Sequence, residues 1–380
     1  MAPPTAPFWL ERTADRGRHN DALAAAAGGR VGLEGVIEGL ERAGRTARRS
    51  RLLRSPVVAG WRWDLRDELS RRWWPQGVTT SADAGAVDAG PATEELAGRR
   101  VVLTSSYSKE VGGVGHGARI SVVDVTDPDR VRYQHVLLVK AVVAENGERD
   151  GAGGVAGGVR FEPVHSHAGG LVWHGDHLHV AATAKGFHTF RLSDIVAAGG
   201  LEGHRGLEGH GHPYLLPARF AHAARTEEGA RAFRYSFLSS VREEGRVAVV
   251  AGEYAPPSGR GSTRLAEVTV DLTTGLPAVD EEGRVRPVLL GEGVRQAQGA
   301  VRAGGRWYVG TSNGRFRRGS TWVGPEARDG LEPRSFTRRA GVLPVGPEDL
   351  AAWPSRDELW TVTEYPGRRR LVVLDRTRLD

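Results

Sequence analysis

Residues 169–180 read GGLVWHGDHLHV, and residues 187–192 read FHTFRL. Each stretch alternates apolar and other side chains, and a Gly-Asp pair separates the two apolar runs of the first. Such alternation broken by glycine turn signals is typical of short antiparallel β-strands joined by hairpins. The segment therefore predicts three consecutive strands.

The same unit recurs four more times along the chain. Its other copies are residues 298–309, 350–361 with 370–375, 236–249 with 265–272, and 76–83 with 101–103 and 120–125. A further β-like segment precedes most units, at residues 134–143, 215–220, 287–290 and 341–345. Repeated units of four short strands are the signature of a β-propeller. We predict an all-β, five-bladed β-propeller over residues 56–380.

The two ends of the chain supply the remaining parts of this prediction. The last unit stops after its third strand at the C-terminus, and residues 56–63 are expected to close the ring as its fourth strand. Residues 1–55 differ in composition, because 22–53 are rich in Ala, Leu, Glu and Arg, with apolar side chains at helical spacing. They predict an N-terminal helical extension as a separate domain.

Composition excludes several classes of protein. The 380 residues contain no cysteine, which rules out disulfide scaffolds, zinc–thiolate sites and cysteine nucleophiles. The net charge of +6 comes from scattered basic residues without a long basic tail, so an anionic small molecule is a better partner than a nucleic acid. No apolar run approaches the ~18 residues of a membrane span.

The first residues lack the basic and apolar regions of a signal peptide. This favours a cytoplasmic protein, or a secreted one if the natural chain begins earlier. Oligomeric state has no signal in the sequence.

The repeat register predicts which side chains converge at the mouth of a central channel. The aligned entry positions are Gln76, His167, Ser236, Gln296 or Gln298, and Glu348, with His165, Tyr235 and Asp349 close behind. Three uses stay open: water in the channel, a substrate site without metal, and a metal site. His167 and Glu348 are the candidate ligands for Ca²⁺ or Mg²⁺, although a single carboxylate makes a weak site. His165 and His167, two residues apart, suit a transition metal.

The ends of the second strands are expected to gather on the same rim. Glu253 and Glu364 are then candidates for a general acid/base pair, and Lys185 or Arg315 for binding an anion. The alternative is that the two Glu-Tyr pairs are structural corners of the blades. Trp74 precedes Gln76 and is a candidate wall of the pocket.

Ten of the thirteen histidines lie between residues 165 and 222. Several fall in the loop that carries a duplicated GLEGH, and others alternate on a strand. We do not expect the cluster to form one metal site.

Residues 73–83 and 164–173, together with Glu253-Tyr254 and Glu364-Tyr365, resemble an actinobacterial family of five-bladed β-propeller proteins. The resemblance extends from about residue 73 to the end of the chain. It implies the propeller fold, and it carries no activity over, because the family's activities are largely uncharacterised. Many members of that family are secreted.

These observations favour a small-molecule enzyme with its active site in the central funnel. The expected chemistry is a non-redox lyase, cyclase or hydrolase step, for example in specialised metabolism, with Ca²⁺ or Mg²⁺ at most a weak helper. His167 would be the base, Glu348 the acid, and Gln76 and Gln298 the orienting amides. A glycoside hydrolase would pair Glu348 with Glu253 or Glu364. The alternative is a lectin-like or protein-docking module, which would bind its ligand between the blades.

Overall fold

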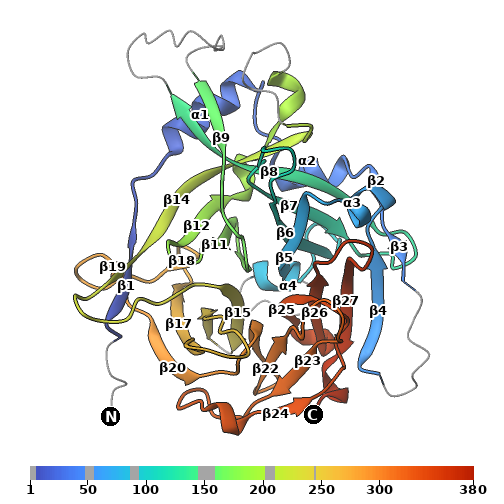
Figure 1. Ribbon diagram of the computed structural model, residues 1–380. Coiled ribbons are helices and arrows are strands. Elements are labelled where there is room, and N and C mark those ends of the chain that lie inside the picture. Colours follow the sequence, from blue (N-terminus) through green and yellow to red (C-terminus); the bar gives the residue numbers. More distant parts are fainter. Residues whose placement is uncertain (1–5, 48–54, 86–93, 144–158, 202–209, 244) are drawn as a thin grey trace.

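The computed structural model describes residues 6–47, 55–85, 94–143, 159–201, 210–243 and 245–380. Within them strands predominate, so the predicted all-β class is confirmed. No helix in these ranges is long and apolar enough to cross a membrane. Figure 1 shows the sheets arranged around a common centre.

Five sets of four strands make up the main body, each set pairing its strands antiparallel in order. The first set is β5 (Trp73–Thr80), β6 (Val101–Ser108), β7 (Ala118–Asp124) and β8 (Arg132–Val143). The second is β10 (Leu171–His174), β11 (His177–Ala181), β12 (Gly186–Arg191) and β14 (Tyr214–Thr226). The third is β15 (Phe237–Glu243), β16 (Arg246–Gly252), β17 (Arg264–Asp271) and β20 (Val288–Glu292). The fourth is β21 (Ala297–Ala303), β22 (Arg306–Thr311), β23 (Ser320–Val323) and β24 (Thr337–Arg339).

The fifth set joins the two ends of the chain. It consists of β25 (Pro347–Trp353), β26 (Glu358–Thr363), β27 (Arg370–Asp375) and β4 (Val57–Arg62). β4 pairs antiparallel with β27, so that Leu371 faces Trp61, which is the expected strand exchange. The ring of Trp61 stacks on Trp360 at 5.8 Å, and both are buried.

The first strands of the five sets contact one another in the cyclic order β5, β10, β15, β21, β25 and back to β5. Their backbones approach closely where glycine stands. A Cβ on Gly170 would lie 2.1 Å from the nitrogen of Leu238, and one on Gly299 2.4 Å from that of Leu350. No side chain fits at these contacts, and the inner strands therefore pack backbone against backbone around a narrow centre.

The first two sets depart from simple repetition. Their fourth strands, β8 and β14, are 12 and 13 residues long. The two strands pair with each other in parallel over residues 136–139 and 214–217, which joins the first two sets into one sheet. The other short elements are β9 (Val159–Pro163), β13 (Val196–Ala197), β18 (Leu276–Pro277), β19 (Arg284–Val285), α3 (Leu65–Leu69), α4 (Ser81–Ala84) and the 3₁₀ turns η3 (Leu192–Asp194), η4 (Ala198–Leu201), η5 (Pro333–Ser335), η6 (Pro354–Arg356) and η7 (Arg376–Arg378).

The N-terminal segment is only partly helical. α1 (Gly17–Ala26) and α2 (Gly32–Glu38) contact β8, and α1 also contacts β14. β1 (Phe8–Arg12) pairs with β14, β2 (Arg42–Ala43) with β8 and β3 (Arg45–Thr46) with β4. The helix expected over 22–53 is therefore wrong at residues 42–46, because two sheet edges offer backbone partners there; residues 48–53 lie outside the described ranges. The domain boundary at residue 55 stays a prediction.

The tryptophans that occupy equivalent repeat positions belong to the core. Trp173 and Trp353 are 2% and 1% exposed. Trp353 packs among Val78, Val102 and Tyr133 between the first and fifth sets. These rings therefore hold neighbouring sheets together.

Candidate functional site

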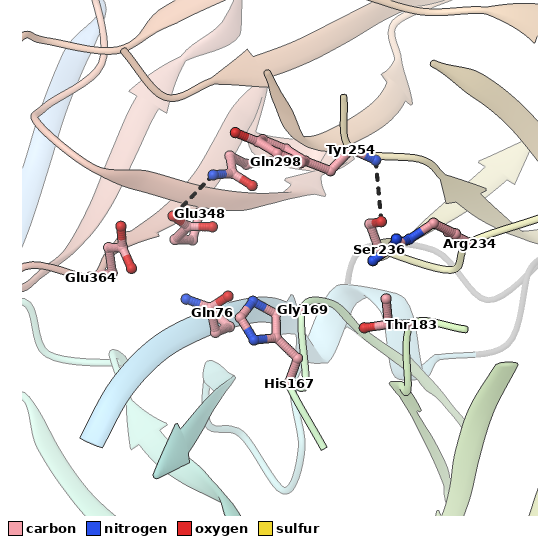
Figure 2. Close-up of a pocket in the computed structure, with 10 residues that line it drawn as sticks. All are labelled: Gln76, His167, Gly169, Thr183, Arg234, Ser236, Tyr254, Gln298, Glu348 and Glu364. Atoms are coloured by element: carbon pink, nitrogen blue, oxygen red, sulfur yellow. Dashed lines mark hydrogen bonds between the residues drawn. The ribbon is translucent and has the colours of Figure 1, made fainter. Parts of the chain in front are cut away.

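A cavity of about 420 Å³ opens where the inner strands begin. Ten residues from all five sets and their connections line it (Figure 2): Gln76, His167, Gly169, Thr183, Arg234, Ser236, Tyr254, Gln298, Glu348 and Glu364. The first-strand entries that the repeat register aligned, with Gln298 as the fourth, all lie in this lining. Convergence of side chains far apart in sequence is what a ligand site needs.

Local backbone irregularities turn three of these side chains toward the cavity. The pairing of β5 with β6 shifts register between Pro75 and Val78, around Gln76. Equivalent shifts surround Gln298 in β21 and follow Glu348 in β25. A β-bulge re-aims the side chain it carries, and bulges are enriched beside active sites.

Two carboxyl groups meet on one wall of the cavity. Glu348 is buried, and its Oε1 accepts a hydrogen bond from Gln298 Nε2 at 3.2 Å (Figure 2). Burial and the neighbouring charges of Glu364 and Asp349 raise the pKa of Glu348 well above its ordinary value. Burial also raises the pKa of Glu364, whose carboxyl shares a hydrogen bond with Glu348. Because like charges disfavour one another, the pair keeps a proton to higher pH than an isolated carboxyl would.

His167 lines the same cavity. Its ring lies 4.5 Å from the ring of Tyr107, centroid to centroid. Desolvation by the surrounding walls, with the nearby Lys109 ammonium, lowers the pKa of His167. The imidazole is therefore neutral at pH 7 and able to accept a proton.

Arg234 is the cation in the cavity lining. Its side chain forms no ion pair with a carboxylate in the described parts of the chain, so its charge is available to an anionic group of a ligand. Sequence reasoning proposed Lys185 or Arg315 for that role, but neither belongs to the cavity lining. The sequence did offer one indication of this position, because Arg234 stands just before Tyr235 at the entry of the third repeat.

Glu253 does not reach the cavity. Its Oε2 and Oε1 accept hydrogen bonds from Arg264 at 2.8 and 2.9 Å, and Oε1 also accepts one from the backbone of Arg234 at 3.0 Å. These contacts lower its pKa despite burial. Glu253 therefore lies outside the cavity lining, and the alternative of a structural corner describes its contacts.

Other candidates also lie outside the cavity lining. Trp74 packs under Lys109, whose Nζ is 3.2 Å from the ring centroid, and Tyr235 is 1% exposed. His165 is exposed near Gly115, and Gln296 lines a second hollow. The described residues contain no group of three or more His, Cys, Asp or Glu side chains that could hold a metal ion. The ring centroids of His174, His177 and His222 each lie 6.0–6.5 Å from that of His179, but these histidines form no such group.

A serine–histidine–aspartate chain lies elsewhere, and sequence reasoning missed it. Ser121 Oγ is 2.9 Å from His135 Nδ1, and His135 Nε2 is 2.8 Å from Asp67 Oδ2. Asp67 is also bound by Arg119 at 3.0 Å. Ser121 is 2% exposed within β7, whereas Asp67, Arg119 and His135 line a hollow of about 210 Å³ whose lining does not include Ser121. Because Ser121 does not line that hollow, its hydroxyl is not placed to attack a substrate there, and the hydrogen bonds of the network join β7, β8 and α3.

Thr183 sits at the cavity with a φ of 53°, a conformation that β-branched residues rarely adopt. Glycine adopts this conformation freely, so Thr183→Gly is expected to stabilise the fold by about 1 kcal/mol. Thr337→Gly is the control: Thr337 lies in β24 without a positive φ, and glycine there should lower stability. Calorimetry measures the melting temperatures of both variants and of the native protein. A lower melting temperature for Thr183→Gly than for the native protein would contradict the prediction that the backbone of Thr183 is strained.

No family model matches the chain, and no curated protein does. Among solved structures, it is similar to a thermostable family-43 glycoside hydrolase, with 11% identity over 80% of this chain and 90% of that one, and a TM-score of 0.38. The Cps50 (Swd1) β-propeller domain of Myceliophteria thermophila shares 10% identity over 72% and 92%, with a TM-score of 0.34. The catalytic domain of the Coprinopsis cinerea GH62 alpha-L-arabinofuranosidase shares 10% identity over 80% and 96%, with a TM-score of 0.32. Likenesses this low carry no argument about the reaction.

Proposed function

We propose that this protein is an enzyme that carries out acid–base chemistry on a small polar molecule in the central cavity. The observation that carries the proposal is that His167, Glu348 and Glu364 line one cavity, where burial lowers the pKa of the imidazole and raises the pKa values of the two carboxyl groups. An enzyme that both removes and donates a proton at one pH needs a base that is unprotonated and an acid that is protonated at that pH. Surroundings that lower the pKa of the base and raise the pKa of the acid provide this. The reaction class is a hydrolase or a lyase/cyclase step.

Each residue of the cavity has a separate role in the proposed reaction. His167 accepts a proton from water or from the substrate, and the Glu348–Glu364 pair donates its proton to the leaving oxygen. Gln76 and Gln298 orient the substrate with amide hydrogen bonds, and Arg234 binds an anionic group. Each of these side chains lines the cavity.

The contact between the carboxyls separates this chemistry from a two-carboxylate glycosidase. Glycosidases hold their carboxyl groups about 5–9.5 Å apart, on either side of the sugar. Glu348 and Glu364 share a hydrogen bond, and Glu253 is occupied by Arg264. Hydrolysis by a water that His167 activates, or elimination, is therefore favoured over a glycosyl-enzyme pathway.

We also propose that the five sets of strands are the blades of one propeller whose axis runs through this cavity. The cyclic contacts of the first strands support the count. The rival function, a lectin-like or protein-docking module, requires a ligand between the blades and no role for the carboxyl pair. A ligand-bound crystal structure separates the two by where the ligand lies.

The proposed acid and base predict a bell-shaped dependence of kcat/KM on pH. Turnover rises as pH increases through the pKa of His167, which lies below the ordinary value of 6.5, because the base must be neutral. Turnover falls as pH increases through the raised pKa of the carboxyl pair, because the acid must keep its proton. Glu364→Gln removes a negative charge beside Glu348 and is expected to move the basic limb to lower pH.

The acidic limb should stay in place in Glu364→Gln. Glu162→Gln, which changes an exposed carboxylate far along the chain from the pair, is the control and should leave both limbs unchanged. An unshifted basic limb in Glu364→Gln would contradict the shared proton.

A further inference from the structure

A second hollow of about 480 Å³ lies beside the fourth set of strands. Its lining comes from the start of β21, the loop between β22 and β23, and the segment after β23: Gln296, Asn313, Arg317, Arg318, Arg338 and Gly341. None of the residues assigned to proton transfer belongs to it.

The hollow is strongly positive. Arg317, Arg318 and Arg338 line it, and among the described residues no acidic side chain does. None of the three forms an ion pair with a carboxylate in the described ranges, whereas Arg334, a few residues away, is paired with Glu332. Three uncompensated guanidinium groups around one hollow repel one another, and an anion placed between them removes that repulsion.

Two of the arginines are held in place by hydrogen bonds. Arg318 donates from Nε to the carbonyl of Gly341 at 2.6 Å and from Nη2 to that of Val342 at 3.3 Å. Arg338 donates from Nε and Nη2 to Ser320 Oγ at 3.2 and 3.1 Å. A guanidinium has five N–H donors, so three remain on each for a ligand. Because these side chains are already ordered, binding costs less entropy than it would for free arginines.

A neutral acceptor completes the hollow. The Nδ2 of Asn313 donates to the Arg318 carbonyl at 2.7 Å and to Ser320 Oγ at 3.1 Å. Its Oδ1 receives no hydrogen bond from a described residue and is free to accept one from a hydroxyl group. Phe316, on the same loop, is 84% exposed and offers an apolar surface for the organic part of a ligand.

We propose that this hollow binds a phosphate or sulfate ester that carries hydroxyl groups. The oxyanion lies between Arg317, Arg318 and Arg338, where guanidinium groups bind oxygen pairs bidentately. A hydroxyl group of the same ligand donates to Asn313 Oδ1. The inference stands on the hollow alone and holds whatever reaction the central cavity performs.

The test is isothermal titration calorimetry with three probes at constant ionic strength. Glucose 6-phosphate and glucose 6-sulfate distinguish the two esters, and glucose measures binding without the charge. Binding of at least one ester, and of glucose not at all, is expected. Arg318→Gln and Arg338→Gln should each weaken ester binding at least tenfold, and Arg334→Gln, the matched control, should leave it unchanged.

Two further variants sharpen the result. Asn313→Ala should weaken binding of glucose 6-sulfate and leave the affinity for inorganic sulfate unchanged, because inorganic sulfate is fully ionised at neutral pH and carries no hydroxyl group. Arg318→Lys keeps the charge and should still weaken binding, which serves if Arg318→Gln fails to fold. The proposal is overturned if neither ester binds the native protein, or if Arg318→Gln and Arg338→Gln bind it as the native protein does. No turnover enters this assay, so its failure is distinct from failure of the proposed enzyme.

Discussion

Glu348→Gln is expected to reduce turnover by about 10²–10⁴-fold, the usual contribution of a positioned general acid. Glutamine keeps the shape of the side chain and can still accept the hydrogen bond of Gln298. It cannot deliver the proton that Glu348 holds. The measurement is conversion of a metabolite mixture followed by mass spectrometry, with native and variant protein compared at equal concentration.

The same substitution should act on stability in the opposite direction. A carboxyl whose pKa is raised in the folded state favours folding only while it is protonated, and this stability is lost as pH rises through the folded pKa. At high pH the ionised Glu348 therefore lowers the free energy of unfolding of the native protein, and Glu348→Gln removes this loss. The variant should melt at a higher temperature than the native protein at pH 8, with the difference vanishing at pH 4.

Glu253→Gln provides the control for both readouts. Glu253 is equally buried, but Arg264 compensates its charge and lowers its pKa. Its replacement should lower stability at pH 7 and leave the catalytic rate of the folded fraction unchanged. Full activity in Glu348→Gln, or equal losses in both variants, would contradict the assignment of the acid.

Asp349→Ala is expected to lower the free energy of unfolding by at least about 3 kcal/mol. Asp349 is 1% exposed at the meeting point of the inner strands. Its carboxyl group, whose pKa burial raises well above the ordinary value, accepts backbone hydrogen bonds from Val78 at 3.0 Å, from Leu350 at 2.9 Å and from Leu171. The first two sets and the fifth are thereby tied together, and each buried N–H left without an acceptor costs about 1–3 kcal/mol.

Urea denaturation measures this loss of unfolding free energy. Asp357→Ala is the control for the strain that alanine introduces at a positive φ. Both aspartates have a φ of 52°, where alanine is strained, but Asp357 lies in an exposed turn and pairs with Arg376. The cost of Asp357→Ala therefore approximates the strain plus a surface ion pair of up to about 1 kcal/mol. Equal losses in the two variants would show that the three hydrogen bonds contribute nothing.

Much of the fold could be read from local patterns. Alternation and glycine turns depend on residues within a few positions of one another, so segments such as 169–180 and 298–309 are recognisable as strand pairs without knowledge of their neighbours. Repetition then supplied the register, and with it the meeting of Gln76, His167 and Glu348 at one cavity. The partner of the last strand followed because the last unit lacked a fourth strand and residues 56–63 stand just before the first unit.

The parallel pairing of β8 with β14 had no local signal. Both strands are longer than the repeat requires, but the sequence does not show where an overhang will lie. The two strands at residues 42–46 could not be predicted from the sequence either. A short segment beside a sheet edge takes its conformation from that edge rather than from its own propensity.

The chemistry of the candidate site was decided by the tertiary structure. In the sequence, Glu253 and Glu364 are equivalent, since each ends a second strand and precedes a tyrosine. In the structure Arg264 neutralises Glu253, whereas Glu364 meets Glu348 and shares its proton. Charge interactions and desolvation depend on distances of a few ångströms between groups that are far apart in the chain. Sequence periodicity thus predicted one rim for both carboxyl groups, and only the folded structure shows that Glu364 lines the cavity and Glu253 does not.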